Sequence, residues 1–174
     1  MRPLLTTAMT LAFLVLVSSL AATKPGCAGT IINACGKFSF SVPDDWRKST
    51  EDDELTVEQT AYESRDGNLY VVAGPLADKT ATLTDEDVVE FLDEQFDRMK
   101  VTSDKKETID KFQVRILEGT GSDDGDAIVF KGIALDTGTE TGVLMVVVSG
   151  AARDMEQTDN VALIDRMLRS IRPH

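Results

Sequence analysis

Apolar and polar positions alternate after residue 37 with the two-residue period of a strand. Phe38, Phe40 and Val42 are apolar, the residues between them are polar, and Pro43 ends the pattern. This pattern is typical of a half-buried strand. Five further strands are predicted, at 55–63, 68–73, 111–120, 127–136 and 142–150.

Turn-forming residues connect these strands into antiparallel units. The Asp-Gly pair within 64–67 favours a tight turn, which predicts a hairpin between the first two of the five strands. Segments 121–126 and 137–141 are rich in Gly, Asp and Thr and join the last three strands into a meander. Residues 143–148 are apolar without interruption, which is typical of a central strand covered on both faces.

Two segments have the period of an amphipathic helix. The first begins at Thr84, with Asp87 placed to complete an N-terminal cap. Its predicted apolar face consists of Val88, Val89, Leu92, Phe96 and Met99. The second is predicted over 159–171, and its predicted buried residues are Val161, Ile164, Leu168 and Ile171, with Leu163 and Met167 beside them.

The order of these elements predicts the fold class. Strands, a helix, strands and a helix in one short chain indicate an α+β domain, in which an antiparallel β-sheet is flanked by helices. We expect this single domain to cover residues 36–172.

The first 22 residues have the character of a secretory signal peptide. Arg2 gives a positive start, residues 4–22 are an apolar run, and small residues end it at Ala21 and Ala22. Cleavage there leaves a leader, residues 23–35, before the domain. A retained membrane anchor is the alternative, because a run of about 19 residues just spans a bilayer. We expect an exported mature chain, periplasmic or extracellular, with no membrane span.

Two cysteines, Cys27 and Cys35, lie close together in the leader. A disulfide between them is the first interpretation, because exported proteins meet an oxidising compartment. Two alternatives stay open. A lipid anchor at Cys27 is disfavoured by the preceding Lys24-Pro25-Gly26, and a redox-active pair is disfavoured by the spacing, which differs from Cys-x-x-Cys.

Charge and motif content exclude several functions. The net charge of −12 disfavours binding to nucleic acid or to anionic membranes. No glycine-rich nucleotide motif is present, so no cofactor is expected. His174 is the only histidine and the last residue, which leaves no histidine base for a serine or cysteine nucleophile. The chain is therefore expected not to be an enzyme.

Clustered carboxylates leave two alternatives open. Asp123, Asp124 and Asp126 share one turn and offer the oxygen ligands that calcium prefers, although their order differs from that of an EF-hand loop. A solvated hairpin tip is the simpler interpretation of the same residues. A carboxylate-dependent hydrolase stays open because the sequence does not show which acidic residues meet in space.

The segment 38–46 resembles the opening of Mog1/PsbP-like domains, including bacterial DcrB-like envelope proteins, in which a strand of alternating apolar residues runs into a proline and then a tryptophan. The order of the later elements is also similar. The resemblance implies an α/β/α sandwich in which Pro43 and Trp46 are structural residues: Pro43 ends the strand and Trp46 packs over the sheet edge. It also implies a non-enzymatic binding or accessory protein of the bacterial envelope, with a protein as its partner. A small-ligand or calcium-binding module is the alternative.

Overall fold

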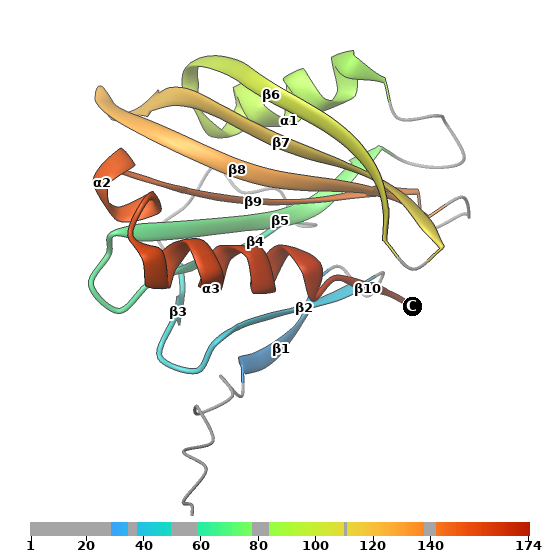
Figure 1. Cartoon of the computed structure of the whole chain (residues 1–174), viewed down its shortest axis with the longest axis horizontal. Helices are drawn as coiled ribbons and strands as arrows, with labels where there is room; N and C mark the ends of the chain where they lie inside the picture. Colours follow the sequence, from blue (N-terminus) through green and yellow to red (C-terminus); the bar gives the residue numbers. More distant parts are fainter. Residues whose placement is uncertain (1–28, 35–37, 50–58, 78–83, 110, 138–141) are drawn as a thin grey trace, which may run out of the picture.

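The computed structural model describes residues 29–34, 38–49, 59–77, 84–109, 111–137 and 142–174 (Figure 1). The strands are β1 Gly29–Ala34, β2 Phe38–Pro43, β3 Arg47–Lys48, β4 Thr60–Glu63, β5 Leu69–Ala77, β6 Asp97–Ile109, β7 Phe112–Asp123, β8 Asp126–Asp136, β9 Val143–Gly150 and β10 Arg172–Pro173. The helices are α1 Asp85–Gln95, α2 Ala152–Met155 and α3 Thr158–Arg169. None of these helices has the length and apolar character needed to cross a membrane.

The predicted signal peptide and both cysteines lie outside the described residues. The disulfide between Cys27 and Cys35, the lipid anchor and the redox pair therefore all stay predictions. β1 lies within 23–35, where no strand was predicted, and it pairs with β2 residue for residue, from Gly29 opposite Pro43 onwards.

The described strands form two antiparallel sheets. The larger has seven strands in the order β3-β4-β5-β9-β8-β7-β6, and the smaller has the order β1-β2-β10. The predicted hairpin and the predicted meander are both part of the larger sheet, as β4–β5 and β7–β8–β9.

β9 lies in the middle of the larger sheet and is buried from Val143 to Ser149. Leu144, Val146 and Val148 face a core cluster that includes residues of α3 and β2, whereas Met145 and Val147 face a second cluster that includes residues of α1. The prediction of a central strand covered on both faces is thus confirmed. α1 and α3 lie on opposite faces of the seven-stranded sheet, and the smaller sheet lies on the same side as α3 (Figure 1).

α1 begins where the sequence predicted. The backbone N–H of Asp87 donates to Thr84 Oγ1 at 3.2 Å, and the backbone N–H of Thr84 donates to Asp87 Oδ2 at 2.8 Å, which is a capping box. Thr84 Oγ1 also donates to Asp87 Oδ2 at 2.6 Å. This hydrogen bond first, and then the one from the Thr84 backbone N–H, hold the pKa of Asp87 below its ordinary value, because both stabilise the ionised carboxylate.

The end of α1 differs from the prediction. The helix stops at Gln95, so Phe96 and Met99 do not lie on it. Phe96 has the extended φ of −142°, and its ring stacks on that of Phe130 in β8 at a centroid distance of 5.7 Å. Its place in the apolar pattern suited either a helix or a strand, and packing against the sheet decided between them.

Two predicted core positions on the helices are exposed. Val89 of α1 is 41% exposed, and Phe91 is buried in its place. Val161 of α3 is 47% exposed, whereas Met167 is buried together with the predicted Ile164, Leu168 and Ile171. The buried face of each helix is rotated slightly about the helix axis from the predicted apolar face. The reason is that packing against the sheet decides which side chains of the helix are covered.

β6 was not predicted at all. Its residues are mostly exposed, and neither face is consistently apolar. It is held by β7, along a ladder that runs from Asp97 opposite Ser122 to Ile109 opposite Phe112. Pairing with a neighbouring strand, rather than its own hydrophobic pattern, therefore makes this segment a strand.

Arg115 of β7 connects β6 to the start of α1. Its guanidinium is hydrogen-bonded to Asp104 of β6, with Nε–Oδ1 3.2 Å and Nη2–Oδ2 2.5 Å, and it lies 2.9 Å from Asp85 Oδ1. The hydrogen bond with Asp104 is the main reason that the pKa of Arg115 lies above its ordinary value. Only 8% of Arg115 is exposed, so it is a buried cation with two carboxylate partners.

Candidate functional site

A hollow of about 920 Å³ lies beside Trp46, between the end of β2, the β4–β5 turn and the first half of α3. We call it the Trp46 hollow. Its lining residues are Pro43, Asp45, Trp46, Ser64, Arg65, Asp66, Asn68, Leu69, Asp159, Asn160, Ala162, Leu163 and Arg166.

Trp46 is positioned by the turn that follows β2. Its backbone N–H donates to the carbonyl oxygen of Pro43 at 3.1 Å, which closes a four-residue turn. The Trp46 side chain is half-buried: it packs against the core cluster on the α3 side of the sheet and also lines the hollow. Leu163 of α3 is half-buried in the same way. Side chains that are already held by packing lose little conformational freedom when a ligand covers them.

The β4–β5 turn forms the second wall, and it is rigidly hydrogen-bonded. Ser64 Oγ donates to Asp66 Oδ1 at 2.7 Å and accepts from the backbone N–H of Leu69 at 3.0 Å. Asn68 Nδ2 donates to Asp66 Oδ2 at 2.9 Å. The hydrogen bond from Ser64, then those from Asn68, hold the pKa of Asp66 below its ordinary value. Asp66 is thus an ionised carboxylate whose oxygens are used to shape the turn. Gly67, with φ of 70°, supplies the conformation that closes it.

Four charged residues of the hollow take part in no ion pair with another described residue: Asp45, Arg65, Asp159 and Arg166. Their side chains present charges of both signs around an apolar floor. Tryptophan and arginine, both present in this lining, are residue types that are enriched at protein-binding surfaces.

A narrow extension of about 60 Å³ continues the hollow towards β1. It shares Pro43, Leu163 and Arg166 with the main hollow and ends at Gly29 and Ser41. Concave surface therefore runs from the first residue of β1 to the β4–β5 turn.

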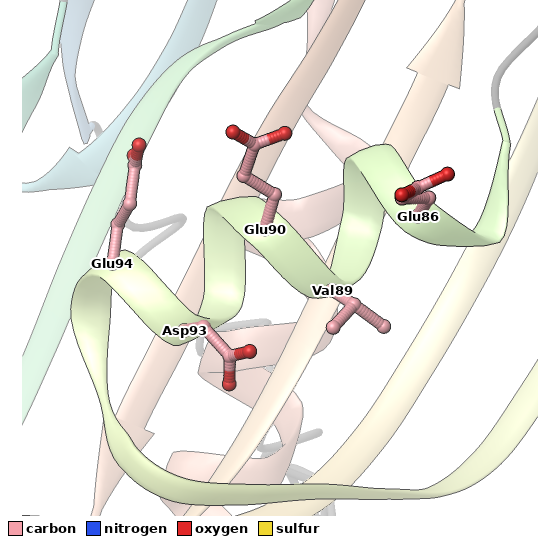
Figure 2. A pocket seen from close by; sticks show the side chains of 5 residues that line it. All are labelled: Glu86, Val89, Glu90, Asp93 and Glu94. Atoms are coloured by element: carbon pink, nitrogen blue, oxygen red, sulfur yellow. The ribbon is translucent and has the colours of Figure 1, made fainter.

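A second concave surface, of about 510 Å³, lies along the outer side of α1 and is strongly acidic. Glu86, Glu90, Asp93 and Glu94 line it together with Val89 (Figure 2). Figure 2 shows these side chains spreading outward from successive turns of the helix, rather than converging on one point. The described residues contain no group of His, Cys, Asp and Glu side chains arranged to hold a metal ion.

The calcium candidate lies at the tip of the β7–β8 hairpin. Asp123 and Asp126 are opposite each other across the ladder, and Asp124 lies in the turn between them; all three are exposed. Asp124 and Gly125 both have positive φ, of 50° and 88°, as a type I′ turn requires. The geometry accounts for these residues as a hairpin turn, and calcium binding here stays a prediction.

The carboxylates with displaced pKa values do not favour acid catalysis. A general acid that works near neutral pH needs a raised carboxyl pKa. Asp66 and Asp87 have a lowered one. For Asp165, burial alone would raise the pKa, but the hydrogen bond from Arg169 and the charge of Lys131 outweigh burial and lower it. All three shifts come from structural hydrogen bonds or ion pairs.

Several solved structures are similar to this chain, and two of them are described. A variant of protein Mog1 matches with a TM-score of 0.53 and 12% identity, covering 83% of this chain and 95% of that one. The solution structure of PsbP from the cyanobacterium Synechocystis matches with a TM-score of 0.57 and 14% identity, covering 87% and 96%. The chain has a Mog1/PsbP-like fold.

The resemblance predicted from the Phe38–Trp46 segment is thereby confirmed at the level of the fold. No protein-family model matches the sequence, and no curated protein matches it either. At identities this low the two structures establish the fold and carry over no binding residue.

Sequence reasoning found Pro43 and Trp46 but not the residues that face them. Arg65 and Asp66 lie in the β4–β5 turn, and Leu163 and Arg166 lie on α3, far away in the sequence. The Asp-Gly turn was recognised, and so was the helix. That the two meet at Trp46 depends on β5 and β9 being neighbours in the sheet, which no local pattern shows.

Proposed function

We propose that this Mog1/PsbP-like chain is an exported, non-enzymatic binding protein of the bacterial envelope, and that it binds a partner protein through the Trp46 hollow. The observation that carries the proposal is the half-buried Trp46 next to charges of both signs without ion-pair partners among the described residues. Tryptophan and arginine are enriched at the residues that contribute most to protein binding. The fold supports a binding role only in general terms, because proteins of one fold differ widely in function.

Site-specific photo-crosslinking tests the binding surface. A photo-reactive phenylalanine analogue replaces Ala162, an exposed residue that lines the hollow, and in a second variant it replaces Glu90 on the outer side of α1. The proposal expects one defined adduct at Ala162 in the cells that make the protein, and none of that mass at Glu90.

The dependence on Trp46 makes the test specific. Trp46→Ala is expected to abolish the adduct, whereas Val89→Ala, which removes an exposed apolar side chain on the other face of the sheet, is expected to keep it. Urea unfolding of both variants checks that they fold. Equal adducts at the two positions, or an adduct that persists in folded Trp46→Ala protein, would contradict the proposed site.

Export is tested separately. The mass of the mature protein from the envelope fraction is expected to correspond to cleavage after Ala21 or Ala22, with two hydrogens missing for a disulfide between Cys27 and Cys35. A full-length chain retained in the membrane would contradict export, and an added lipid mass on Cys27 would replace the disulfide by an anchor.

A further inference from the structure

β1 differs from the other outer strands of the described sheets in its own residues and in its regular register. β6 carries many charged side chains and shifts of register, β3 consists of two basic residues, and β10 has only two residues, one of them Pro173. Charges, bulges, proline and shortness are the means by which proteins prevent their outer strands from pairing with other chains.

None of these features is present in β1. It has six residues, Gly-Thr-Ile-Ile-Asn-Ala, with no charge and no proline, and its register with β2 is regular. The strand is paired with β2 on one edge only, and no described strand pairs with the other edge.

One face of β1 also carries an exposed apolar side chain. Ile32 is 7% exposed and belongs to the core, whereas Ile31, on the opposite face of the strand, is 70% exposed. No other large hydrophobic side chain among the described residues is as exposed as Ile31. A β-branched residue in this position is suited to packing against another strand.

We propose that β1 pairs antiparallel with β1 of a second copy of this chain, which joins two three-stranded sheets into one of six strands. A two-fold axis perpendicular to the sheet keeps the same face of each strand on the same side, so Ile31 can only lie opposite an odd-numbered residue of the other copy. Pairing Ile31 with Ile31 covers the two most exposed apolar side chains with each other.

Charge explains why the contact forms at this edge. Two chains of net charge −12 repel each other over most of their surface, but β1 itself has no charge. A neighbouring carboxylate, Asp44, accepts a hydrogen bond from Thr30 Oγ1 at 2.8 Å and follows Pro43, the partner of Gly29. In an antiparallel pair the two Asp44 residues lie at opposite ends of the interface, which keeps them apart.

Sedimentation equilibrium of the mature protein over the micromolar range tests the proposal. The wild-type chain is expected to be a dimer. Ile31→Lys places two positive charges opposite each other on the axis and is expected to weaken the dimer by about a hundredfold or more, without loss of fold because the position is exposed. Val161→Lys, at an exposed apolar position on α3, is the matched control and is expected to remain dimeric.

Each other result overturns the inference. A wild-type chain that stays monomeric excludes the second copy, and a dimer that Ile31→Lys leaves unchanged places the interface elsewhere. A photo-reactive residue at position 31 is expected to give an adduct of twice the chain mass, whereas an adduct with a different protein would assign β1 to a heterologous partner. The test of the β1 dimer is independent of the test of the Trp46 hollow, because neither variant at position 31 changes a residue that lines the hollow.

Discussion

Gly119 and Phe130 lie opposite each other across the β7–β8 ladder, and the Phe130 ring occupies the space that a Cβ atom at position 119 would need. The same ring stacks on Phe96 at the end of α1. The absence of a side chain at Gly119 therefore leaves room for the Phe130 ring, which contacts the residue that follows α1.

Gly119→Ala is expected to lower the free energy of unfolding by about 1–3 kcal/mol, because the added methyl group meets both the Phe130 ring and the carbonyl oxygen of Lys100. Urea unfolding measures the change. Gly121→Ala, in the same strand, is the control: its nearest neighbours would lie at 3.3 Å, so a smaller loss is expected. Equal losses at the two positions would contradict a specific clash with the Phe130 ring, because the loss of backbone freedom in the unfolded chain by itself makes Gly→Ala stabilising.

The Arg115–Asp104 pair makes a second prediction. Asp104→Ala leaves a largely buried guanidinium with Asp85, whose side chain is 90% exposed, and the carbonyl oxygen of Thr84 at 3.4 Å, and we expect a loss of about 2 kcal/mol in unfolding free energy. Asp85→Ala is expected to cost less than about 0.5 kcal/mol, because an exposed carboxylate contributes little. The opposite order would mean that α1, rather than β6, holds Arg115 in place.

A third prediction concerns the capping box of α1. Thr84→Ala removes the acceptor for the Asp87 backbone N–H and is expected to cost about 1 kcal/mol, with faster hydrogen exchange in the first turn of α1. Thr84→Ser keeps the hydroxyl and is expected to retain most of the stability. If hydrogen exchange in the first turn of α1 were equally fast in Thr84→Ala and Thr84→Ser, the result would contradict a role for the cap.

Stability is expected to fall in acid. Asp66, Asp87 and Asp165 have pKa values below their ordinary value in the folded chain. Their contribution is therefore complete above the unfolded pKa of about 3.9 and is lost as the pH falls through the lower folded pKa values. Unfolding free energy measured from pH 7 to pH 2 is expected to be level at first and then to decrease below about pH 4.

Asp165→Asn isolates one contribution to this profile. It removes the carboxylate that pairs with Lys131 at 3.4 Å and Arg169 at 3.2 Å, so the variant is expected to be less stable at neutral pH and to have a shallower acid decrease. Asp93→Asn, at an exposed carboxylate in no ion pair with a described residue, should keep the wild-type slope. If the unfolding free energy of Asp165→Asn decreased in acid with the same slope as that of the wild type, Asp165 would not contribute to the acid decrease.

Strong local patterns predicted their elements well. The alternation from Phe38 to Val42, the uninterrupted apolar β9 and the capping pair Thr84 and Asp87 all lie where the sequence placed them. Each depends on contacts between near neighbours or on burial of a whole face, which a short segment encodes by itself. The Mog1/PsbP-like fold also followed from the opening motif and the order of the elements.

Other features needed the assembled sheet. β6 has no apolar face of its own and becomes a strand only by pairing with β7, and Phe96 leaves α1 to stack on Phe130. The exposure of Val89 and Val161 depends on how each helix is rotated over the strands.

The sequence by itself determined the acidity of the chain, the start of its first helix, its central strand and the place of Pro43 and Trp46 in a motif. Only the tertiary structure decided that α3 and the β4–β5 turn line a hollow beside Trp46, and that β1 has an edge with which no described strand pairs, with Ile31 exposed. The reason is physical: hydrogen bonds and burial within a segment depend on its own residues, whereas a hollow or an open edge depends on which distant strands become neighbours.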